Sequence, residues 1–314
     1  MRLSTSSMYG LGLSAMLKQQ SDFTNVAQQL ASGKRVVSPS DDPRAATQAL
    51  GVSQAIAVSE QYASSRTTAK QSLEMEEGVL QNVTDALQSL SPLIVQAGNG
   101  TLSDSDRESL ATQIDGLNQQ MLGLANSQDG NGNYIFSGMK GDTQPFQTDA
   151  TDSTKVSYQG AEKLQMEQRV DASRQMTTGD LGSQVFEDNL SGETGSNIFN
   201  TLADFVAALK APQENDDSAK ASFNTALSTA SQRVSQSLDN VLTVRASIGS
   251  KLNELDALDV TGDSRVLNYK STLSDLQDLD YASAISDYTL KQVSLQAAQK
   301  TFTQIQGMSL FDLL

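Results

Sequence analysis

Few side chains in this 314-residue sequence could take part in catalysis, because the chain contains no Cys and no His. Histidine is the side chain whose ordinary pKa lies near neutral pH, and cysteine is a common nucleophile, so two frequent catalytic groups are missing. The carboxylates, lysines and tyrosines that remain form no recognisable catalytic cluster along the sequence. We therefore expect no enzyme, and no catalytic or cofactor-binding residues.

One motif imitates a metal site. Asp129, Asn131 and Asn133 have the spacing that opens a calcium-binding loop. Such a loop requires Gly at its sixth position and Glu at its twelfth, where this chain has Tyr134 and Lys140. We therefore expect no metal site.

The net charge of the chain restricts the classes of molecule that it can bind. The formal charge of -15 repels phosphate backbones and anionic membranes. No apolar run approaches the roughly 20 residues that cross a bilayer. We expect neither nucleic acid nor membrane as a partner. The first 12 residues also lack the pattern of a secretory signal peptide, which would normally indicate a cytoplasmic protein.

Both ends of the chain carry apolar residues at the alternating three-and-four spacing of a coiled-coil seam. The seam positions are Leu13, Met16, Gln20, Phe23, Ala27 and Leu30 near the N-terminus, and Tyr281, Ile285, Tyr288, Gln292, Leu295, Gln299 and Phe302 near the C-terminus. The amides weaken both seams, so neither helix should form a stable isolated dimer. We expect the two ends to pair with each other and to form the assembly interface with neighbouring copies. An ordinary helix face in a monomeric bundle is the alternative that periodicity alone leaves open.

The middle of the chain predicts long helices. Asp42 can cap a helix that begins at Pro43 and runs to Ala97, about 80 Å at 1.5 Å per residue. A continuous heptad pattern makes this helix a permanent core element: Leu73, Leu80, Leu87 and Ile94. A capping box at Ser103 and Asp106 opens a second, antiparallel helix.

Between the helical halves, short strands are expected. They lie at residues 134–136, around Phe146, at 156–158 and at 164–166, and helix resumes at 197–210 and again through Phe223 to Leu255. The predicted fold class is mainly α with a small β-rich insertion, an elongated helical rod with coiled-coil terminal helices. The predicted domains are residues 1–42 with 277–314 (terminal coiled coil), 43–133 with 191–276 (helical rod), and 134–190 (small β-rich outer domain).

Residues 30–46, Leu-Ala-Ser-Gly-Lys-Arg-Val-Val-Ser-Pro-Ser-Asp-Asp-Pro-Arg-Ala-Ala, closely resemble the N-terminal signature of the flagellin superfamily. Their Asp-Asp-Pro is the version found in hook–filament junction proteins, whereas filament flagellins usually have Asp-Asp-Ala. Similar motifs follow at residues 132–138, 176–182, 279–282 and 295–300. The resemblance covers essentially the whole chain.

This resemblance implies a structural subunit that forms a short ring between the hook and the filament of the bacterial flagellum. The implied partners are further copies of the chain, the hook-side junction protein, filament flagellin and a cytoplasmic export chaperone. Export through the flagellar type III channel would explain the missing signal peptide. The chain would then be cytoplasmic before export and extracellular in the flagellum afterwards.

The resemblance also points to particular residues. The implied chaperone-binding segment, residues 292–314, contains Leu295, Phe302, Ile305, Leu310 and Phe311. The loop that joins the terminal helix to the rod contains the junction residues Lys34, Arg35, Asp41, Asp42 and Pro43. Exposed charges in a solvated loop contribute only about 0 to 1 kcal/mol, so this loop is expected to matter little for stability.

Two other functions remain open. A minor filament flagellin would polymerise into long filaments, but the long insertion that begins at Tyr134 argues against it. A secreted type III effector with coiled-coil ends would need a catalytic cluster, which the sequence lacks. A translocator would need membrane segments.

Overall fold

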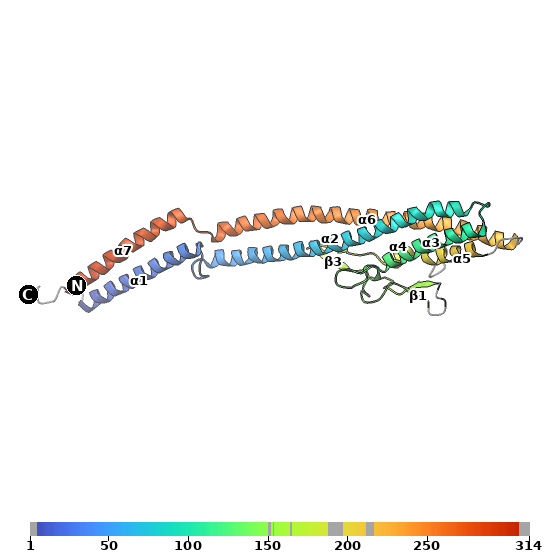
Figure 1. Cartoon of the computed structure of the whole chain (residues 1–314). Coiled ribbons are helices and arrows are strands. Elements are labelled where there is room, and N and C mark those ends of the chain that lie inside the picture. The colour runs from blue at the N-terminus through green and yellow to red at the C-terminus, as the bar shows by residue number, and fades with distance from the viewer. Residues whose placement is uncertain are drawn as a thin grey trace, which may run out of the picture. The chain divides into compact units, whose positions relative to one another are not determined.

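The computed structural model describes residues 5–149, 152, 154–163, 165–187, 197–211 and 217–307. Helices dominate, as the predicted fold class requires (Figure 1). The helices are α1 (Thr5–Ser32), α2 (Pro43–Ala97), α3 (Asp104–Ala125), α4 (Gly182–Phe186), α5 (Ile198–Lys210), α6 (Asp217–Gln277) and α7 (Tyr281–Gly307), with a 3-10 turn η1 (Ile135–Ser137). The strands are β1 (Phe146–Thr148), β2 (Val156–Tyr158), β3 (Glu167–Asp171) and β4 (Arg174–Thr177).

The contacts within the chain divide it into two compact units. Unit 1 comprises Met1–Glu60 and Asp263–Leu314, and unit 2 comprises Gln61–Gly262. Both α2 and α6 contribute residues to each unit. The three domains proposed from the sequence follow the breaks between helices instead, and that division stays a prediction.

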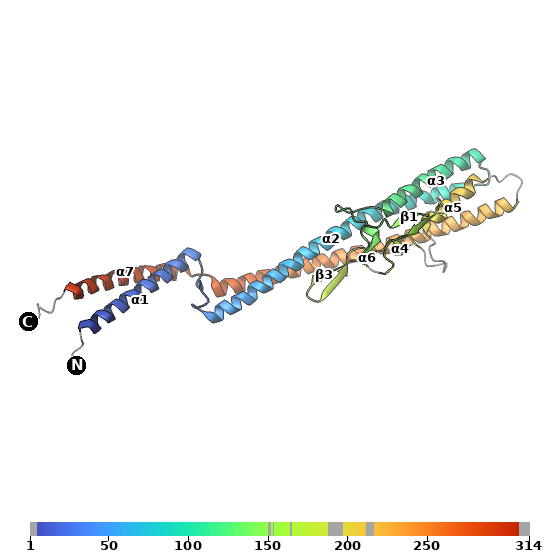
Figure 2. The ribbon, with the colours of Figure 1, turned by 90° about the horizontal axis from the view of Figure 1, so that it is seen from below.

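The core of unit 2 contains the heptad positions of α2, so the prediction of a permanent core there is confirmed. Leu73, Leu80, Leu87 and Ile94 are buried. They belong to one apolar cluster with residues from α3, α5 and α6, among them Ile114, Met121, Phe205, Val241 and Ile248. Figure 2 shows α3 and α5 side by side against α2 and α6.

Helix α2 begins and ends where the sequence predicted. The Oδ1 atom of Asp42 accepts a hydrogen bond from the Ala45 backbone N–H at 3.0 Å. Pro43 then opens the helix, where its missing N–H costs nothing. The capping box of α3 is also confirmed, because Ser103 and Asp106 each bind the other's backbone N–H.

The β-rich segment consists of two antiparallel pairs. Strand β1 pairs with β2, with Phe146 opposite Tyr158. Strand β3 pairs with β4, with a bulge between Arg169 and Asp171. These pairs confirm the predicted strands at Phe146 and at 156–158.

One strand prediction was wrong, and another was displaced by a few residues. Tyr134, Ile135 and Phe136 alternate in hydrophobicity, but residues 135–137 form the 3-10 turn η1, and Gly138 follows with φ of +62°. A positive φ turns the chain out of an extended path. Residue 164 lies outside the described residues, Gln165 and Met166 lie outside the strands, and β3 begins at residue 167. Most residues of β3 are polar, and Val170 is its one buried residue. The strand therefore lacks the hydrophobic alternation that would have predicted it.

In unit 1, α1 and α7 lie side by side and run antiparallel (Figure 1). The described ends of the chain therefore lie at the same end of this helix pair. Within the described part of the chain, no helix combines the length and apolar content needed to cross a membrane.

Candidate assembly surface

Aromatic side chains hold α1 against α7. The rings of Phe23 and Tyr288 have centroids 4.9 Å apart, and those of Tyr9 and Phe302 are 5.2 Å apart. A Cβ atom on Gly12 would lie 3.3 Å from the Phe302 ring, so glycine gives the ring room there. The two ends of the chain therefore pair within one molecule through residues of the predicted seams.

The predicted interface residues fall into two groups. Those half-buried in the chain are Leu13, Met16, Phe23, Leu30, Tyr288, Leu295 and Phe302. Those exposed are Gln20, Tyr281, Ile285 and Gln292. It is Gln19, one residue before Gln20, that is partly buried, and its Oε1 atom is buried without a hydrogen-bond partner among the described residues. Contact of either group with neighbouring copies stays a prediction.

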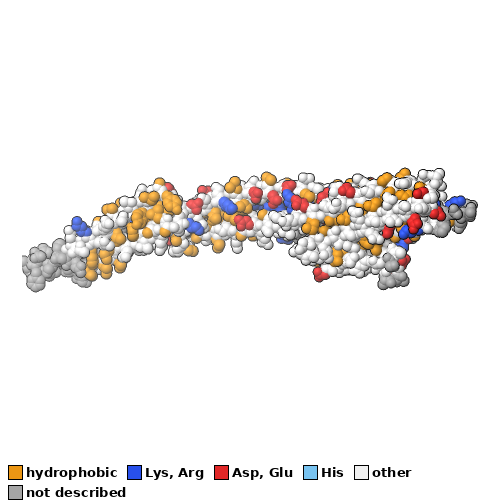
Figure 3. Space-filling view, viewed as in Figure 1, with side chains coloured by type: hydrophobic (Ala, Val, Ile, Leu, Met, Phe, Trp, Pro, Cys, Tyr) orange, Lys and Arg blue, Asp and Glu red, His pale blue; other side chains and the backbone are white. Residues whose placement is uncertain are grey.

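Several exposed apolar residues of these helices were missed by the sequence analysis. Leu11 is 64% exposed, Leu17 54%, Leu290 62% and Val293 57%. They lie off the seam spacing, and that displacement is the signal that could have identified them. Figure 3 shows apolar side chains at the surface over α1 and α7.

Helix geometry places these exposed residues away from the intrachain contact. Leu290 lies two residues after Tyr288, and Leu11 lies two residues after Tyr9. Two residues correspond to about 200° around a helix, so each leucine faces away from the aromatic contact beside it. Leu17 is six residues from Leu11, about 120° away, so apolar side chains occupy more than one side of α1.

The loop after α1 is hydrogen-bonded to the loop between α6 and α7. Gly33 has φ of +68°, and its carbonyl accepts a hydrogen bond from the Leu279 N–H at 3.0 Å. The Arg35 N–H donates to the Gln277 carbonyl at 2.7 Å. Lys34 forms an isolated antiparallel bridge with Asp278 through the backbone. These bonds tie the α1–α2 loop to the α6–α7 loop.

The charged junction residues meet within this loop. The Arg35 guanidinium contacts Asp42 at 3.3 Å and donates to the Leu276 carbonyl at 2.9 Å. The backbone N–H of Ala45 lowers the pKa of Asp42, and Arg35 acts in the same direction. Asp41 accepts backbone hydrogen bonds from residues 37 and 38. Arg35 thus bridges the two connections, a role that the sequence analysis did not assign to it.

The predicted chaperone-binding residues can be located only in part. Leu295 and Phe302 lie in α7, half-buried beside α1. The backbone of Ile305 belongs to α7, whereas its side chain, Leu310 and Phe311 lie outside what the structure describes. A chaperone that holds Leu295 and Phe302 would have to bind α7 while it is apart from α1.

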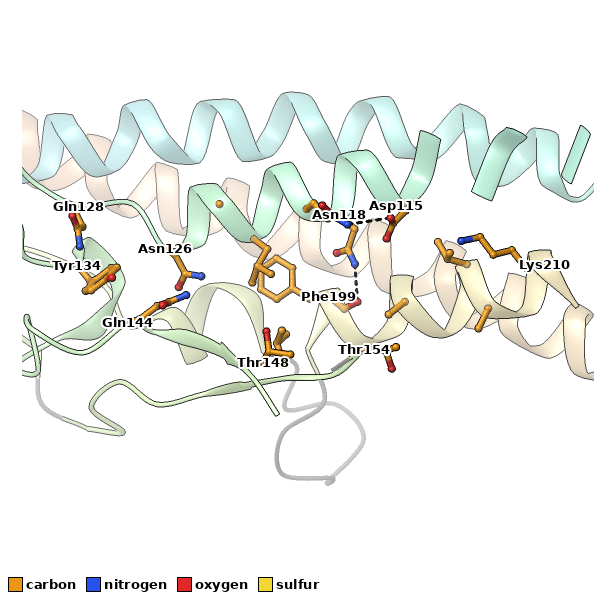
Figure 4. A pocket seen from close by; sticks show the side chains of 17 residues that line it. Asp115, Asn118, Asn126, Gln128, Tyr134, Gln144, Thr148, Thr154, Phe199 and Lys210 are labelled. Atoms are coloured by element: carbon orange, nitrogen blue, oxygen red, sulfur yellow. Dashed lines mark hydrogen bonds between the residues drawn. The ribbon is translucent and has the colours of Figure 1, made fainter. Parts of the chain in front are cut away.

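Unit 2 contains a cavity of about 1040 Å³ between α3, α5 and the β1–β2 pair, lined by both polar and apolar side chains (Figure 4). Several of its amide groups bond to the protein, whereas the Asn118 Oδ1 atom is buried without a hydrogen-bond partner among the described residues. The Asn118 side chain donates to the Phe199 carbonyl at 3.1 Å, and Asn126 both donates to and accepts from the Phe146 backbone at 3.0 and 2.9 Å. These amides connect α3 to α5 and to β1.

The calcium-like motif also forms a turn. The Asp129 carboxylate accepts hydrogen bonds from the backbone N–H groups of Asn131 and Asn133 at 2.8 and 2.9 Å. The described residues contain no group of three or more acidic side chains that could hold a metal ion.

Comparison with known proteins defines the class. Residues 3–141 match the model of the bacterial flagellin N-terminal helical region. This segment covers α1, α2, α3 and the turn η1. The N-terminal helices are therefore similar to those of the flagellins.

Full-length relatives define the family. The chain is 44% identical to flagellar hook-associated protein 3 from Salmonella typhimurium and from Escherichia coli, over 100% of this chain and 99% of each relative. It belongs to the flagellar hook-associated protein 3 family, structural proteins of the hook–filament junction. Flagellins from Listeria, Bacillus and Salmonella match at 22 to 26% identity.

The fold agrees with this assignment. The crystal structure of flagellar hook-associated protein 3 from Legionella pneumophila matches with a TM-score of 0.65 and 21% identity. The match covers 72% of this chain and 98% of that structure.

Proposed function

We propose that copies of this chain form a short ring that joins the hook to the filament, and that the ring acts mechanically and not as an enzyme. Its contacts with further copies, with the hook-side junction protein and with filament flagellin are made through α1 and α7. Membership in the hook-associated family supports this proposal. The observation that carries it is the exposure of apolar side chains around the α1–α7 pair.

Those side chains favour contact with more than one neighbour. Leu11 and Leu290 face away from the contact between α1 and α7, so the helix pair is apolar on its outer sides as well. Burying a leucine fully contributes about 1.5 to 3 kcal/mol, and each of these is more than half exposed in the single chain. Packing between neighbours therefore gains roughly 1 to 2 kcal/mol from each.

Export precedes this assembly in the proposal. The chain leaves the cytoplasm by the flagellar type III route with its C-terminal segment held by a chaperone, and becomes extracellular in the flagellum. The support is physical: α7 carries apolar side chains on several sides, and such a surface aggregates when it is free in the cytoplasm. A helix of this kind suits a groove that covers it.

A complementation experiment tests the contact surface. We would express full-length Leu290→Asp in a strain that lacks the gene and count cells with attached filaments. A charge at this position would be buried only after assembly, so we expect loss of filaments and release of flagellin into the medium. The thermal unfolding of the purified variant should match that of the original chain.

Gln296→Asp is the matched control, because it adds the same charge to α7 at an exposed polar position. It should support filaments. Normal filament attachment with Leu290→Asp, together with normal amounts of the variant in the flagellum, would refute the proposed surface.

A further inference from the structure

Glu76 of α2 is a carboxylic acid in the interior of unit 2. Its side chain is 0% exposed. Its Oε1 atom accepts a hydrogen bond from the Asp180 backbone N–H at 3.1 Å. Its Oε2 atom is buried and has no hydrogen-bond partner among the described residues.

Asp180 presents a second carboxyl group at this place, from the segment between β4 and α4. Its Oδ1 atom accepts a hydrogen bond from the Gln165 side chain at 3.2 Å. Its Oδ2 atom is buried and, like Glu76 Oε2, lacks a hydrogen-bond partner among the described residues. The Lys251 ammonium lies 3.6 Å from this atom, close enough for an ion pair but not for a hydrogen bond.

The surrounding charges leave one cation for two acids. Lys251 faces the site from α6, and Glu77 lies beside Glu76 on α2. The Arg245 guanidinium is engaged by Glu77, with contacts of 2.9 and 2.7 Å, so Lys251 is left for both Glu76 and Asp180. Two ionised carboxylates here would bury a net negative charge and two unpaired oxygen atoms, and both are costly.

We propose that Glu76 carries a proton while Asp180 is paired with Lys251, and that this proton keeps the segment between β4 and α4 fastened to α2. The proton removes one of the two negative charges, so that Lys251 can balance the other. Its loss to the solvent at alkaline pH leaves two like charges side by side and loosens the segment.

The electrostatics of Glu76 agree with the geometry. Burial raises the pKa of Glu76 to about 8, and the Asp180 and Glu77 charges act in the same direction, whereas the hydrogen bond from the Asp180 backbone N–H and the Lys251 charge oppose them. The acid is therefore mainly protonated at neutral pH.

The fastened segment supports the β-rich part of unit 2. Leu181 is fully buried, and α4 follows directly with Phe186 packed edge-on against Phe136 and Phe146. A Cβ atom on Gly182 would lie 2.9 Å from the Phe146 ring, so this backbone sits tightly on the aromatic core. Glu76 therefore contacts the segment that leads from β4 into this aromatic cluster.

The first test is the titration of Glu76 in the full-length chain, followed by NMR with carbon-13 in the glutamate carboxyl groups. The Glu76→Gln variant identifies the signal by its absence. We expect this signal to titrate about three units above an ordinary glutamate, and Glu77→Gln, the adjacent control, to leave a titration well above the ordinary range. Titration of Glu76 in the ordinary range would overturn the proposal.

The second test asks whether the Asp180 charge, and not burial alone, holds the proton on Glu76. Asp180→Asn removes the second charge and supplies an amide donor, so the pKa of Glu76 should fall by at least one unit. An unchanged pKa of Glu76 in a folded Asp180→Asn variant would show that burial alone holds the proton, and would overturn the part assigned to Asp180.

The third test measures the fastening. Hydrogen exchange at residues 178–182 should accelerate between pH 7 and pH 9 by about tenfold beyond the intrinsic pH effect. Glu76→Gln, which keeps a donor toward Asp180 and cannot titrate, should lack this additional acceleration. Equal pH dependence in the two proteins would contradict the release.

Discussion

In unit 1, the Tyr281 hydroxyl group occupies the space that a side chain on Gly33 would need. A Cβ atom on Gly33 would lie 2.7 Å from the hydroxyl oxygen and 3.8 Å from the ring carbon that carries it. Gly33 also has φ of +68°, which L-residues with side chains rarely adopt. The start of α7 is thus fitted to a glycine at the end of α1.

Gly33→Ala should therefore destabilise the connection between the two loops of unit 1. The left-handed backbone costs about 1 kcal/mol for alanine, and the contact with Tyr281 adds to this cost. Combining the change with Tyr281→Phe removes the hydroxyl and should recover the contact part but not the backbone part. Hydrogen exchange of the Arg35 and Leu279 amides measures the effect. Equal loss of amide protection in the single and double variants would show that the contact with Tyr281 does not contribute to stability.

Two arginines contact both the β3–β4 hairpin and α6, and we expect them to contribute differently to the free energy of unfolding. Arg66 is 3% exposed, contacts Asp259 and donates to the Val170 carbonyl at 3.1 Å. Arg66→Ala should cost about 1 to 3 kcal/mol, because it leaves a buried carbonyl without its donor. Arg174 forms a bidentate pair with Glu254 in solvent, and Arg174→Ala should cost about 0 to 1 kcal/mol. Urea unfolding compares the two variants, and similar costs would contradict this ranking.

The free energy of unfolding should fall as the pH rises from about 5 to about 8. Unfolded Glu76 loses its proton near its ordinary value of 4.5, whereas the folded protein keeps it up to a pKa of about 8. Unfolding therefore releases a proton in this range, and stability decreases by about 1 kcal/mol per pH unit and then levels off. Glu76→Gln should abolish this slope in urea unfolding curves. A slope of the same size in both proteins would assign it to other groups.

The α1–α7 pair should open before unit 2. Among the α1 and α7 residues whose burial the structure describes, Ala284 is the one buried apolar side chain, at 6% exposed, whereas α2 alone contributes many to the core of unit 2. Few buried contacts mean a small free energy of local opening. Native-state hydrogen exchange should show faster exchange in the middle of α1 and α7 than around Leu80 and Ile114. Uniform protection in all of these helices would contradict this order.

The helical framework could be predicted from the sequence because its signals are local and repeated. Asp42 and Pro43 mark the start of α2, and leucines at seven-residue intervals identify its buried face. The β-rich part carried weaker signals. Phe136 is buried in a 3-10 turn and not in a strand, and hydrophobic alternation does not reveal the positive φ that Gly138 adopts after it.

The candidate surface was only partly predictable for another reason. A heptad pattern identifies an apolar face but cannot say whether it is covered by the same chain or by another. Phe23 and Tyr288 face each other within the chain, whereas Leu11 and Leu290 lie off the heptad and remain exposed. Likewise, Glu76 lies among heptad leucines on α2, and its link to Asp180 depends on a contact between residues 104 positions apart.

The most direct test of the proposed junction ring is the position of the chain in the assembled flagellum. We would label the full-length chain in cells of its source bacterium with a specific antibody and gold, and examine whole flagella by electron microscopy. The account predicts a single band at the distal end of the hook, where the filament begins. Label distributed along the filament, as a minor flagellin would give, would contradict it.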